Sequence, residues 1–275
     1  MKSKTMITVL VEDHGTKPKL GTEHGLAIWI EAGDHHVLFD TGQTDLLLTN
    51  AMALGVDLTQ TDAIVLSHGH YDHTGGLAAV LDMAPQARVF MHPEATEPKF
   101  SLKDSGTHSV GMPEQARQAL KGRRVTWTAT PAIVCPGISV TGQVPRSNPW
   151  ENVGSNFYLD QSCSRPDTLP DDQSLWIETE QGISVVLGCA HAGVLNTLRY
   201  VAGLTGTQTF HTVVGGMHLL HALPERIRQT EATLKTYHLH CLAPGHCTGE
   251  YVMEQWSQIF NACYSPCFAG AKITL

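Results

Sequence analysis

Four side chains that can bind a metal ion lie within six residues of this chain. Residues 67–76 read Ser-His-Gly-His-Tyr-Asp-His-Thr-Gly-Gly, and the potential ligands in that string are His68, His70, Asp72 and His73. Three imidazoles and a carboxylate are ligands suited to Zn²⁺, Mn²⁺ or Fe²⁺. A single histidine in a loop is usually an ordinary surface or core residue. Four potential ligands flanked by glycines predict a metal-binding loop instead.

The sequence around this loop predicts how it is positioned. Residues 63–66 form a short apolar run typical of a buried strand, which ends where the loop begins. Residues 75–83 predict a helix directly behind the loop, and residues 88–91 predict the next strand, which together make a βαβ step. The loop therefore connects a strand end to a helix, where irregular backbone allows several side chains to converge on one point.

The rest of the chain alternates strand and helix patterns, without a repeat, low-complexity tract or linker. Two sheets with apolar faces bury them on each other and leave helices to cover the outside. We therefore expect one α/β domain over residues 1–275, a four-layer αββα sandwich. Residues 93–123 carry Pro, Gly and Ser interruptions around a helical stretch at 113–120, and predict a lid-like insertion.

The other expected elements follow from the same apolar patterns. The expected helices are 44–54, 194–202, 224–238 and 250–260. The expected strands of the N-terminal part are 7–12, 26–31 and 36–40. A second sheet is expected from 125–128, 138–141, 155–159, 174–178 and 183–188, followed by strands at 212–214, 240–243 and 272–275.

Charge and composition exclude several classes of protein. The formal net charge is −8, and the compact basic run at residues 121–124 is too small for the footprint of a nucleic-acid-binding protein. No run of about 18 apolar residues predicts a membrane span, and residues 1–6 lead into a strand pattern without the features of a signal peptide. We expect a cytoplasmic protein that acts on a small molecule and binds neither nucleic acid nor membrane. The sequence leaves its oligomeric state open.

Seven cysteines are scattered along the chain without a Cys-x-x-Cys pair. An odd number at irregular spacing argues against a disulfide framework, so we expect most of them to be buried, reduced thiols. Cys189 is the exception, because it follows the apolar strand 183–188 and precedes His191 by two residues.

The string His-x-His-x-Asp-His resembles the signature of the metallo-β-lactamase superfamily, and Asp40-Thr-Gly is similar to that family's upstream aspartate motif. The resemblance implies that His68 and His70 hold one metal ion. It also implies that Asp72 and His73 hold a second ion, and that Asp40 orients the loop histidines by hydrogen bonds.

The family also supplies a third histidine, a bridging aspartate and a final histidine as ligands. His246, at the end of a predicted strand and before a helix, matches the final histidine. The chain has no histidine from residue 109 to residue 190, so the usual third-histidine loop is absent. Where the bridging aspartate would follow a strand, the chain has Cys189-Ala-His191. His191 is the expected replacement ligand, and Cys189 is either a ligand or a small packed residue.

The histidines that lack such a setting, and that we expect at the surface or in the core, are His35, His36, His238 and His240.

Further strings narrow the resemblance to the dihydropteroate-synthase-like branch of the superfamily. That branch includes an enzyme of archaeal methanopterin synthesis, which joins a pterin to a ribosyl-aminobenzene phosphate, and many members described only as hydrolases. Besides residues 67–77, the strings that carry this resemblance are Glu23-His-Gly-Leu-Ala27, Val144-Pro-Arg146, Gly188-Cys-Ala-His-Ala-Gly193, Gly215-Gly-Met-His-Leu219 and Pro244-Gly-His-Cys-Thr-Gly249.

The chemistry implied is that of two divalent metal ions, with zinc favoured and manganese or iron as alternatives. Such an ion lowers the pKa of a bound water from about 15.7 toward about 7, so that a metal-activated hydroxide serves as the nucleophile. Asp72 would ligate and would also orient the water or shuttle its proton. Arg146 and His218, which fall at predicted strand ends, are the expected contacts for a small anionic substrate.

Three functions are compatible with these residues. The leading hypothesis is hydrolysis of a small ester, phosphoester or lactone. The alternative is a transferase that condenses a pterin pyrophosphate with an arylamine, in which the metals stabilise the leaving diphosphate. A third, non-catalytic hypothesis is a metal or redox sensor, because the thiols of Cys189 and Cys247 adjoin expected ligands.

Overall fold

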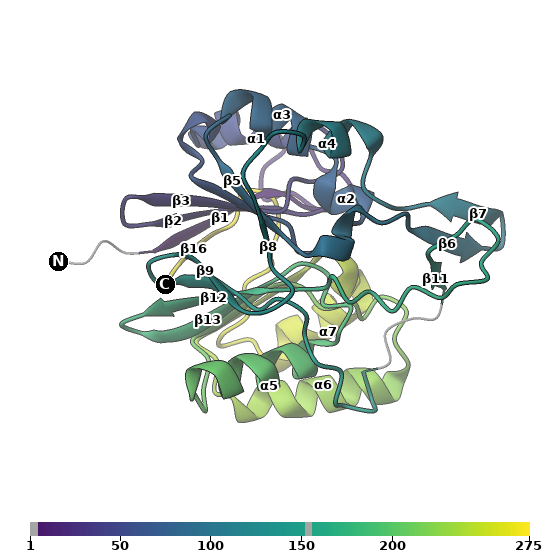
Figure 1. Cartoon of the computed structure of the whole chain (residues 1–275). Coiled ribbons are helices and arrows are strands. Elements are labelled where there is room, and N and C mark those ends of the chain that lie inside the picture. The colour runs from purple at the N-terminus through teal and green to yellow at the C-terminus, as the bar shows by residue number, and fades with distance from the viewer. Residues whose placement is uncertain (1–4, 152–155) are drawn as a thin grey trace.

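Two β-sheets lie face to face in the centre of the computed structural model, which describes residues 5–151 and 156–275 (Figure 1). Within those residues the first sheet has seven strands and the second has six. The first sheet runs, in spatial order, β16 (Lys272–Thr274), β1 (Met6–Val11), β2 (Ala27–Ala32), β3 (His35–Phe39), β4 (Ala63–Val65), β5 (Arg88–Met91) and β8 (Val125–Trp127). The second runs β15 (Cys241–Gly245), β14 (Thr212–Gly216), β13 (Gly182–Leu187), β12 (Leu175–Thr179), β10 (Ile138–Val140) and β9 (Ala132–Cys135).

Alternation along the strands divides the apolar side chains between the two faces of each sheet. In β2, Ile28 and Ile30 pack between the sheets, whereas Ala27 and Trp29 face the outer helical layer. This follows because successive side chains of a strand point to opposite faces. In the second sheet Val186 of β13 also packs between the sheets. Both faces of both sheets are therefore buried, which explains the nearly continuous apolar runs in the sequence.

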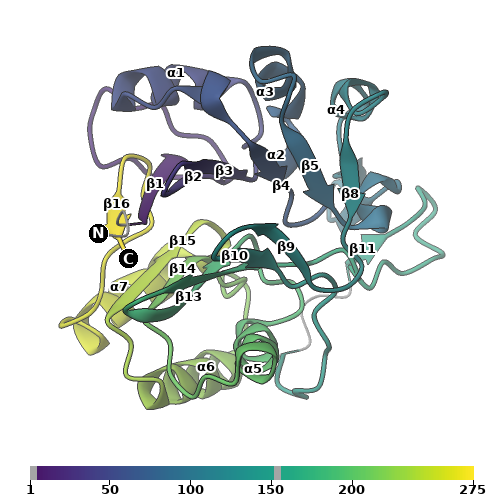
Figure 2. The ribbon, with the colours of Figure 1, turned by 60° about the vertical axis from the view of Figure 1, so that its left-hand side comes forward.

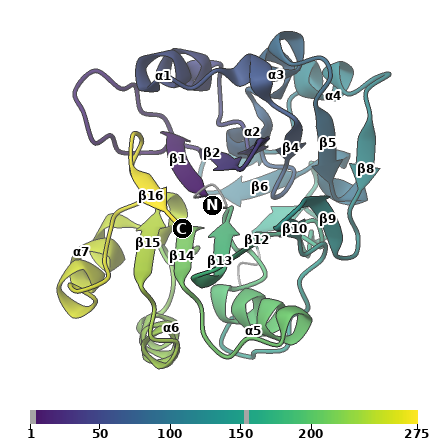
Figure 3. The same cartoon turned by 90° about the vertical axis from the view of Figure 1, so that its left-hand side faces the viewer.

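Helices cover the outer face of each sheet, so the predicted αββα sandwich is confirmed (Figures 2 and 3). Among the described residues, no helix is both long enough and apolar enough to cross a bilayer. The helices over the first sheet are α1 (Leu46–Leu54), α3 (Leu77–Met83) and α4 (Glu114–Ala119), and those over the second are α5 (Val194–Thr205), α6 (Pro224–Thr236) and α7 (Glu250–Ile259).

Two expected strands lie outside the sheet that the sequence predicts for them. Residues 125–128 are predicted to start the second sheet, but β8 pairs in parallel with β5 at the edge of the first. In the predicted strand 155–159, residue 155 lies outside the described residues, and β11 (Phe157–Tyr158) belongs to a small third sheet instead. Sheet membership depends on pairing between distant segments, which a local pattern of apolar residues does not encode.

Residues 93–123 divide between two places. The hairpin of β6 (Phe100–Lys103) and β7 (Gly106–Ser109) pairs with β11 and extends from one side of the sandwich (Figure 1). Helix α4 instead covers the first sheet, where Ala116 packs into the apolar layer. The hairpin is not predicted from the sequence because most of its side chains are exposed or half-buried and show no apolar alternation. The remaining short helices are η1 (Leu58–Gln60), α2 (Tyr71–Thr74), η2 (Pro93–Thr96) and η3 (His246–Thr248).

Gly215, in β14 between two parallel neighbours, tests the packing of the second sheet. Its φ is +118°, and a Cβ there would lie 2.0 Å from the carbonyl oxygen of Leu187. We therefore expect Gly215→Ala to lower the free energy of unfolding by about 2 kcal/mol or more, from backbone strain and displacement of β13. Urea unfolding of chelator-treated protein measures this.

The matched control is Gly203→Ala in α5, where a Cβ would meet open space. Alanine is favoured over glycine within a helix by about 0.5–1 kcal/mol, so this variant should be slightly more stable than the parent. Equal stabilities for Gly215→Ala and the parent chain would contradict the described approach of β14 to β13.

Candidate metal centre

The expected metal-binding residues lie where neighbouring strands of the two sheets end. Strands β3 and β4 run parallel, and Asp40 and the histidine loop follow their carboxyl ends. Strands β13, β14 and β15 also run parallel, and they are followed by Cys189, His218 and His246. The carboxyl ends of parallel strands are where α/β proteins commonly place their binding sites. The two sets of loops meet, since His73 Nε2 and His246 Nε2 are 3.2 Å apart.

Asp40 is fully buried and orients two rings of the histidine loop. Its carboxylate accepts three hydrogen bonds of 2.7 Å, from the backbone N–H and the hydroxyl of Ser67 and from Nδ1 of His73. Ser67 Oγ is also 2.8 Å from Nδ1 of His68, so it accepts from that ring while it donates to Asp40. With Nδ1 of both rings engaged as a donor, Nε2 is the nitrogen of each ring that is left to bind a metal.

His68, His70 and His191 form a buried three-histidine group whose ligand nitrogens lie within 4.8 Å of one another. His68 Nε2 is 3.0 Å from His70 Nδ1. Within residues 5–151 and 156–275, His70 Nε2 and both ring nitrogens of His191 are buried without a hydrogen-bond partner. Burial lowers the pKa of His70 to about 3 and holds the pKa values of His68 and His191 well below their usual range. Divalent ions bind neutral imidazoles with free lone pairs, so this group fits a metal.

Asp72, His73 and His246 form a second group, the aspartate group, whose ligand atoms also lie within 4.8 Å of one another. Asp72 Oδ2 is 3.3 Å from His73 Nε2 and 3.4 Å from His246 Nε2. Burial alone would lower the pKa of His73, but the carboxylates of Asp72 and Asp40 outweigh it and raise that pKa to about 9. Burial alone would raise the pKa of Asp72, but His73 and His246 hold it well below its usual range. These carboxylates make a buried cation favourable here, as a metal site requires.

Cys189 lies between the two groups. Its Sγ is 3.1 Å from His73 Nε2, and it forms a third set of ligand atoms within 4.8 Å together with His68 and His73. Burial raises the pKa of its thiol well above the usual value, so the thiol stays protonated unless a metal ion displaces the proton. Cys247 lies against it, with Sγ 3.5 Å from the carbonyl oxygen of Cys189. Cys189 thus lies within reach of one donor from each group, His68 and His73. Among the described residues, His35, His36, His238 and His240 lie outside the donor groups.

Arg146 and His218, the expected substrate contacts, have different surroundings. Arg146 Nη1 donates to the carbonyl of His191 at 2.8 Å, and its Nη2 donates to the carbonyl of Thr168 at 2.7 Å. These bonds engage the guanidinium with backbone and give it a role in holding the turn at His191. The ring centroid of His218 is 4.4 Å from that of His191, and its Nδ1 is buried without a partner in the described part of the chain. His218 is therefore the better placed of the two to contact a substrate.

Two adjacent acidic residues, which sequence reasoning misses, hold the ligand loops together. Asp172 accepts the backbone N–H of His191 at 2.9 Å and that of the next residue at 2.8 Å. Asp171 accepts the N–H of Gly69 in the histidine loop at 2.8 Å and pairs with the buried Lys99 at 3.0 Å. The sequence signal is only a pair of neighbouring carboxylates, because backbone N–H partners are not marked by any residue type. Segment 171–172 thus links the loops of both sheets.

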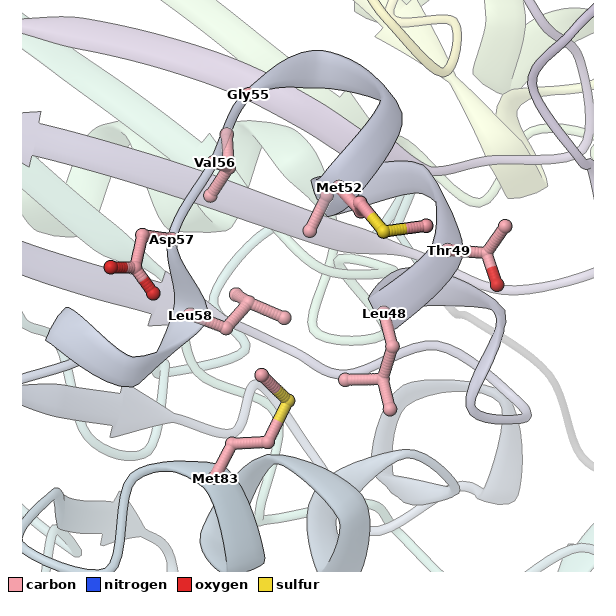
Figure 4. A pocket seen from close by; sticks show the side chains of 9 residues that line it. Leu48, Thr49, Met52, Gly55, Val56, Asp57, Leu58 and Met83 are labelled. Carbon is pink, nitrogen blue, oxygen red and sulfur yellow. The ribbon is translucent and has the colours of Figure 1, made fainter.

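A hollow of about 540 Å³ lies on the outer helical layer, at α1, η1 and α3, and contains none of these ligands (Figure 4). Its lining offers one carboxylate, Asp57, and neither histidine nor cysteine. The cluster of ligands, and not this hollow, is therefore the candidate functional site. The other residues that line the hollow are Leu48, Thr49, Ala51, Met52, Gly55, Val56, Leu58 and Met83.

Comparisons with known proteins agree with this fold. Residues 20–142 match the family model of the metallo-beta-lactamase superfamily. The chain is similar to the 7,8-dihydropterin-6-methyl-4-(β-D-ribofuranosyl)-aminobenzene-5′-phosphate synthase of Methanocaldococcus jannaschii, with 30% identity over 97% of this chain and 95% of that protein. An uncharacterised protein of the same organism is also 30% identical, over 94% of this chain and 96% of its own length.

A solved structure extends this similarity to the three-dimensional level. The crystal structure described as a metal-dependent hydrolase of the β-lactamase superfamily has a TM-score of 0.84 and 28% identity, and the match covers 98% of this chain and 99% of that one. The similarity therefore spans both sheets and both sets of loops that carry the donor groups.

Asp172→Asn tests the support of the three-histidine group. The amide keeps one acceptor oxygen but turns an N–H₂ group toward a backbone N–H, so the turn that carries His191 should shift. Loss of a group that orients a ligand typically costs 10–100-fold in metal affinity, and we expect about that loss for the ion at His191. Competition with a chromophoric zinc chelator measures it.

The control for this variant is Asp160→Asn, an exposed aspartate that also accepts backbone N–H groups, those of Ser164 and Arg165. It should bind zinc as the parent chain does. An unchanged zinc affinity in Asp172→Asn would show that the hydrogen bonds between Asp172 and the backbone at His191 are not needed for metal binding.

Proposed function

Because this chain belongs to the metallo-β-lactamase superfamily, we propose that it is a metal-dependent hydrolase of small anionic esters, phosphoesters or lactones that works with two divalent ions. The observation that carries the proposal is the pair of buried donor groups, which adjoin where Cys189 Sγ lies 3.1 Å from His73 Nε2. A globule of this size buries a core without a structural metal, so ions held here would serve the chemistry.

Each donor group has the composition of a divalent-metal site. The three-histidine group would hold one ion, the aspartate group would hold the other, and Cys189 would lie at the border between them. Catalytic zinc sites use three protein ligands and keep a further position for water or substrate. Nitrogen-rich donors of this kind favour zinc, with manganese or iron as alternatives.

The arrangement indicates which parts of the reaction the ions would perform and which parts the side chains would perform. A divalent ion held by these groups would lower the pKa of water from about 15.7 toward about 7 and would polarise a carbonyl or phosphoryl oxygen. Asp72, held ionised by His73 and His246, orients the attacking water and accepts its hydrogen bond. His218, beside His191, contacts the anionic group of the substrate. The hydrogen bonds of Asp40 hold the ligand rings in place before substrate arrives, so little reorganisation is needed.

A second candidate activity, condensation of a pterin pyrophosphate with an arylamine, is favoured by one observation. The Methanocaldococcus protein that is 30% identical over 97% of this chain is a synthase of a dihydropterin-aminobenzene compound. In such a reaction the ions would stabilise the leaving diphosphate, and no water would need to be activated.

A substrate panel separates these candidates. Zinc-, manganese- and iron-loaded protein would be assayed on phosphodiesters, carboxylic esters and lactones, and on dihydropterin pyrophosphate with and without an arylamine. The hydrolase proposal predicts turnover of a member of the first set that a chelator abolishes. Diphosphate release that requires the arylamine would replace it with the transferase. Absence of all turnover, together with thiol reactivity of Cys189 and Cys247 that depends on metal occupancy, would favour a sensor.

Asp72→Ala tests the role of the aspartate group. The variant loses a charged ligand, so we expect turnover to fall to background and the content of bound metal to drop, while the fold stays intact. Elemental analysis and far-UV circular dichroism measure the last two. Asp82→Ala, which removes an exposed carboxylate in α3, should behave like the parent chain. Full activity in Asp72→Ala would refute this mechanism.

A further inference from the structure

His24 lies beside the aspartate group, in the loop that joins β1 to β2. Its Nε2 is 3.4 Å from Asp72 Oδ2, and its Nδ1 is 3.0 Å from Asp13 Oδ2. Its ring centroid is 4.8 Å from that of His246. The Glu-His-Gly string at residues 23–25, which the metal-binding motifs do not explain, therefore brings an additional imidazole to the metal centre.

Asp13 orients His24 in the same way as it orients His246. Its Oδ1 is 2.8 Å from His246 Nδ1, while its Oδ2 faces His24 Nδ1. Burial alone would raise the pKa of Asp13, but the hydrogen bonds from His24 and His246 outweigh it and lower that pKa below its usual range. An ionised carboxylate accepts from Nδ1–H, and a ring that donates from Nδ1 presents the lone pair of Nε2. Both rings thus present Nε2 toward Asp72.

The backbone after His24 is fixed against the ligand loop. The N–H of Leu26 donates to the carbonyl of Asp72 at 3.2 Å. Gly25 has a φ of +150°, and a Cβ there would lie 2.5 Å from the same carbonyl oxygen, so glycine permits this close approach. The position of the His24 ring is therefore set by backbone contacts with the residue that it faces.

Three imidazole nitrogens approach Asp72 Oδ2 at nearly equal distances. Nε2 lies 3.3 Å away in His73, 3.4 Å away in His246 and 3.4 Å away in His24. Ligand atoms bound at about 2.0–2.2 Å to one tetrahedral ion are separated by about 3.3–3.5 Å. A direct N–H···O hydrogen bond is shorter, at about 2.9–3.0 Å. The distance between His24 Nε2 and Asp72 Oδ2 thus fits two ligands of a shared ion, and His24 belongs, with Asp13 and His246, to a set of donor atoms that lie within 4.8 Å of one another.

We propose that His24 is the fourth protein ligand of the ion held by the aspartate group. The inference rests on the proposed function, because it presupposes that ion. The side chain of His24 is 51% exposed and that of Asp72 is 8% exposed, so the additional ligand closes the solvent-facing side of the group. Four protein ligands close a zinc site, whereas three leave a position open. The open position for water and substrate therefore lies at the three-histidine group.

Metal binding by His24→Ala tests the proposal, with His36→Ala as the matched control. His36 is a half-buried histidine on β3 whose Nδ1 lies 4.0 Å from the carboxylate of Asp62, outside both donor groups. Metal-depleted proteins would be titrated with Zn²⁺ against a chromophoric chelator, and the visible spectrum of the Co²⁺-loaded forms would report the coordination number. His24→Gln, which retains a polar side chain of similar length without an imidazole, guards against a folding defect in the alanine variant.

We expect one of the two ions to bind about 10–100-fold more weakly in both His24 variants, by analogy with the loss of groups that support metal ligands. The other ion should bind as in the parent chain. The Co²⁺ spectrum should change, and free imidazole should restore it in His24→Ala, because the exposed ring leaves a space open to solvent. His36→Ala should match the parent in all these measurements.

Two results would overturn the proposal. One of them would leave the proposed function intact, and the other would refute it as well. Unchanged affinities and an unchanged Co²⁺ spectrum in both His24 variants would assign His24 to hydrogen bonding with Asp72, and the two-ion hydrolase would stand. A parent chain that binds no ion would remove the proposed function and the ligand role of His24 together.

Discussion

The rest of the candidate metal centre depends on the hydrogen bonds that the buried carboxylate of Asp40 accepts. It accepts three hydrogen bonds of 2.7 Å from Ser67 and His73, and without such partners an ionised group at this depth would be strongly destabilising. Ser67 and Asp40 also limit how closely the second sheet approaches the first. A Cβ at Gly188, at the end of β13, would lie 2.2 Å from Ser67 Oγ and 3.3 Å from Asp40 Oδ2. One carboxylate thus orients the histidine loop and sets the spacing between the sheets at the site.

The same arrangement recurs around the centre. Asp13 faces Nδ1 of His246 as Asp40 faces Nδ1 of His73, and Asp172 accepts the backbone N–H of His191. Asp40 and Asp13 each lie at Nδ1 of a ring and leave its Nε2 for a metal, whereas Asp172 positions the backbone of His191. The ligands come from loops of both sheets, so the proposed ions would also join the two halves of the sandwich. The positions of the proposed ligands therefore depend on how the two sheets pack against each other.

The sequence predicts the features that are local and leaves out those that depend on distant partners. Strand β4 and the ligands of residues 68–73 are contiguous, so their pattern is visible in one short string. Strand β8 is predicted in the wrong sheet, because its partner β5 lies far away in the sequence. The family resemblance, and not spacing, indicates the distant ligand His246. His24 and Asp172 are missed, because one meets a ligand from another loop and the other meets backbone N–H groups.

Anomalous diffraction from crystals of the zinc-loaded protein, measured on both sides of the zinc absorption edge, tests the two-ion centre most directly. We predict two anomalous peaks within coordination distance of protein ligands. One should be surrounded by His68, His70 and His191, and the other by Asp72, His73 and His246. The absence of a peak among these side chains, or a single ion held by other residues, would contradict the proposed centre.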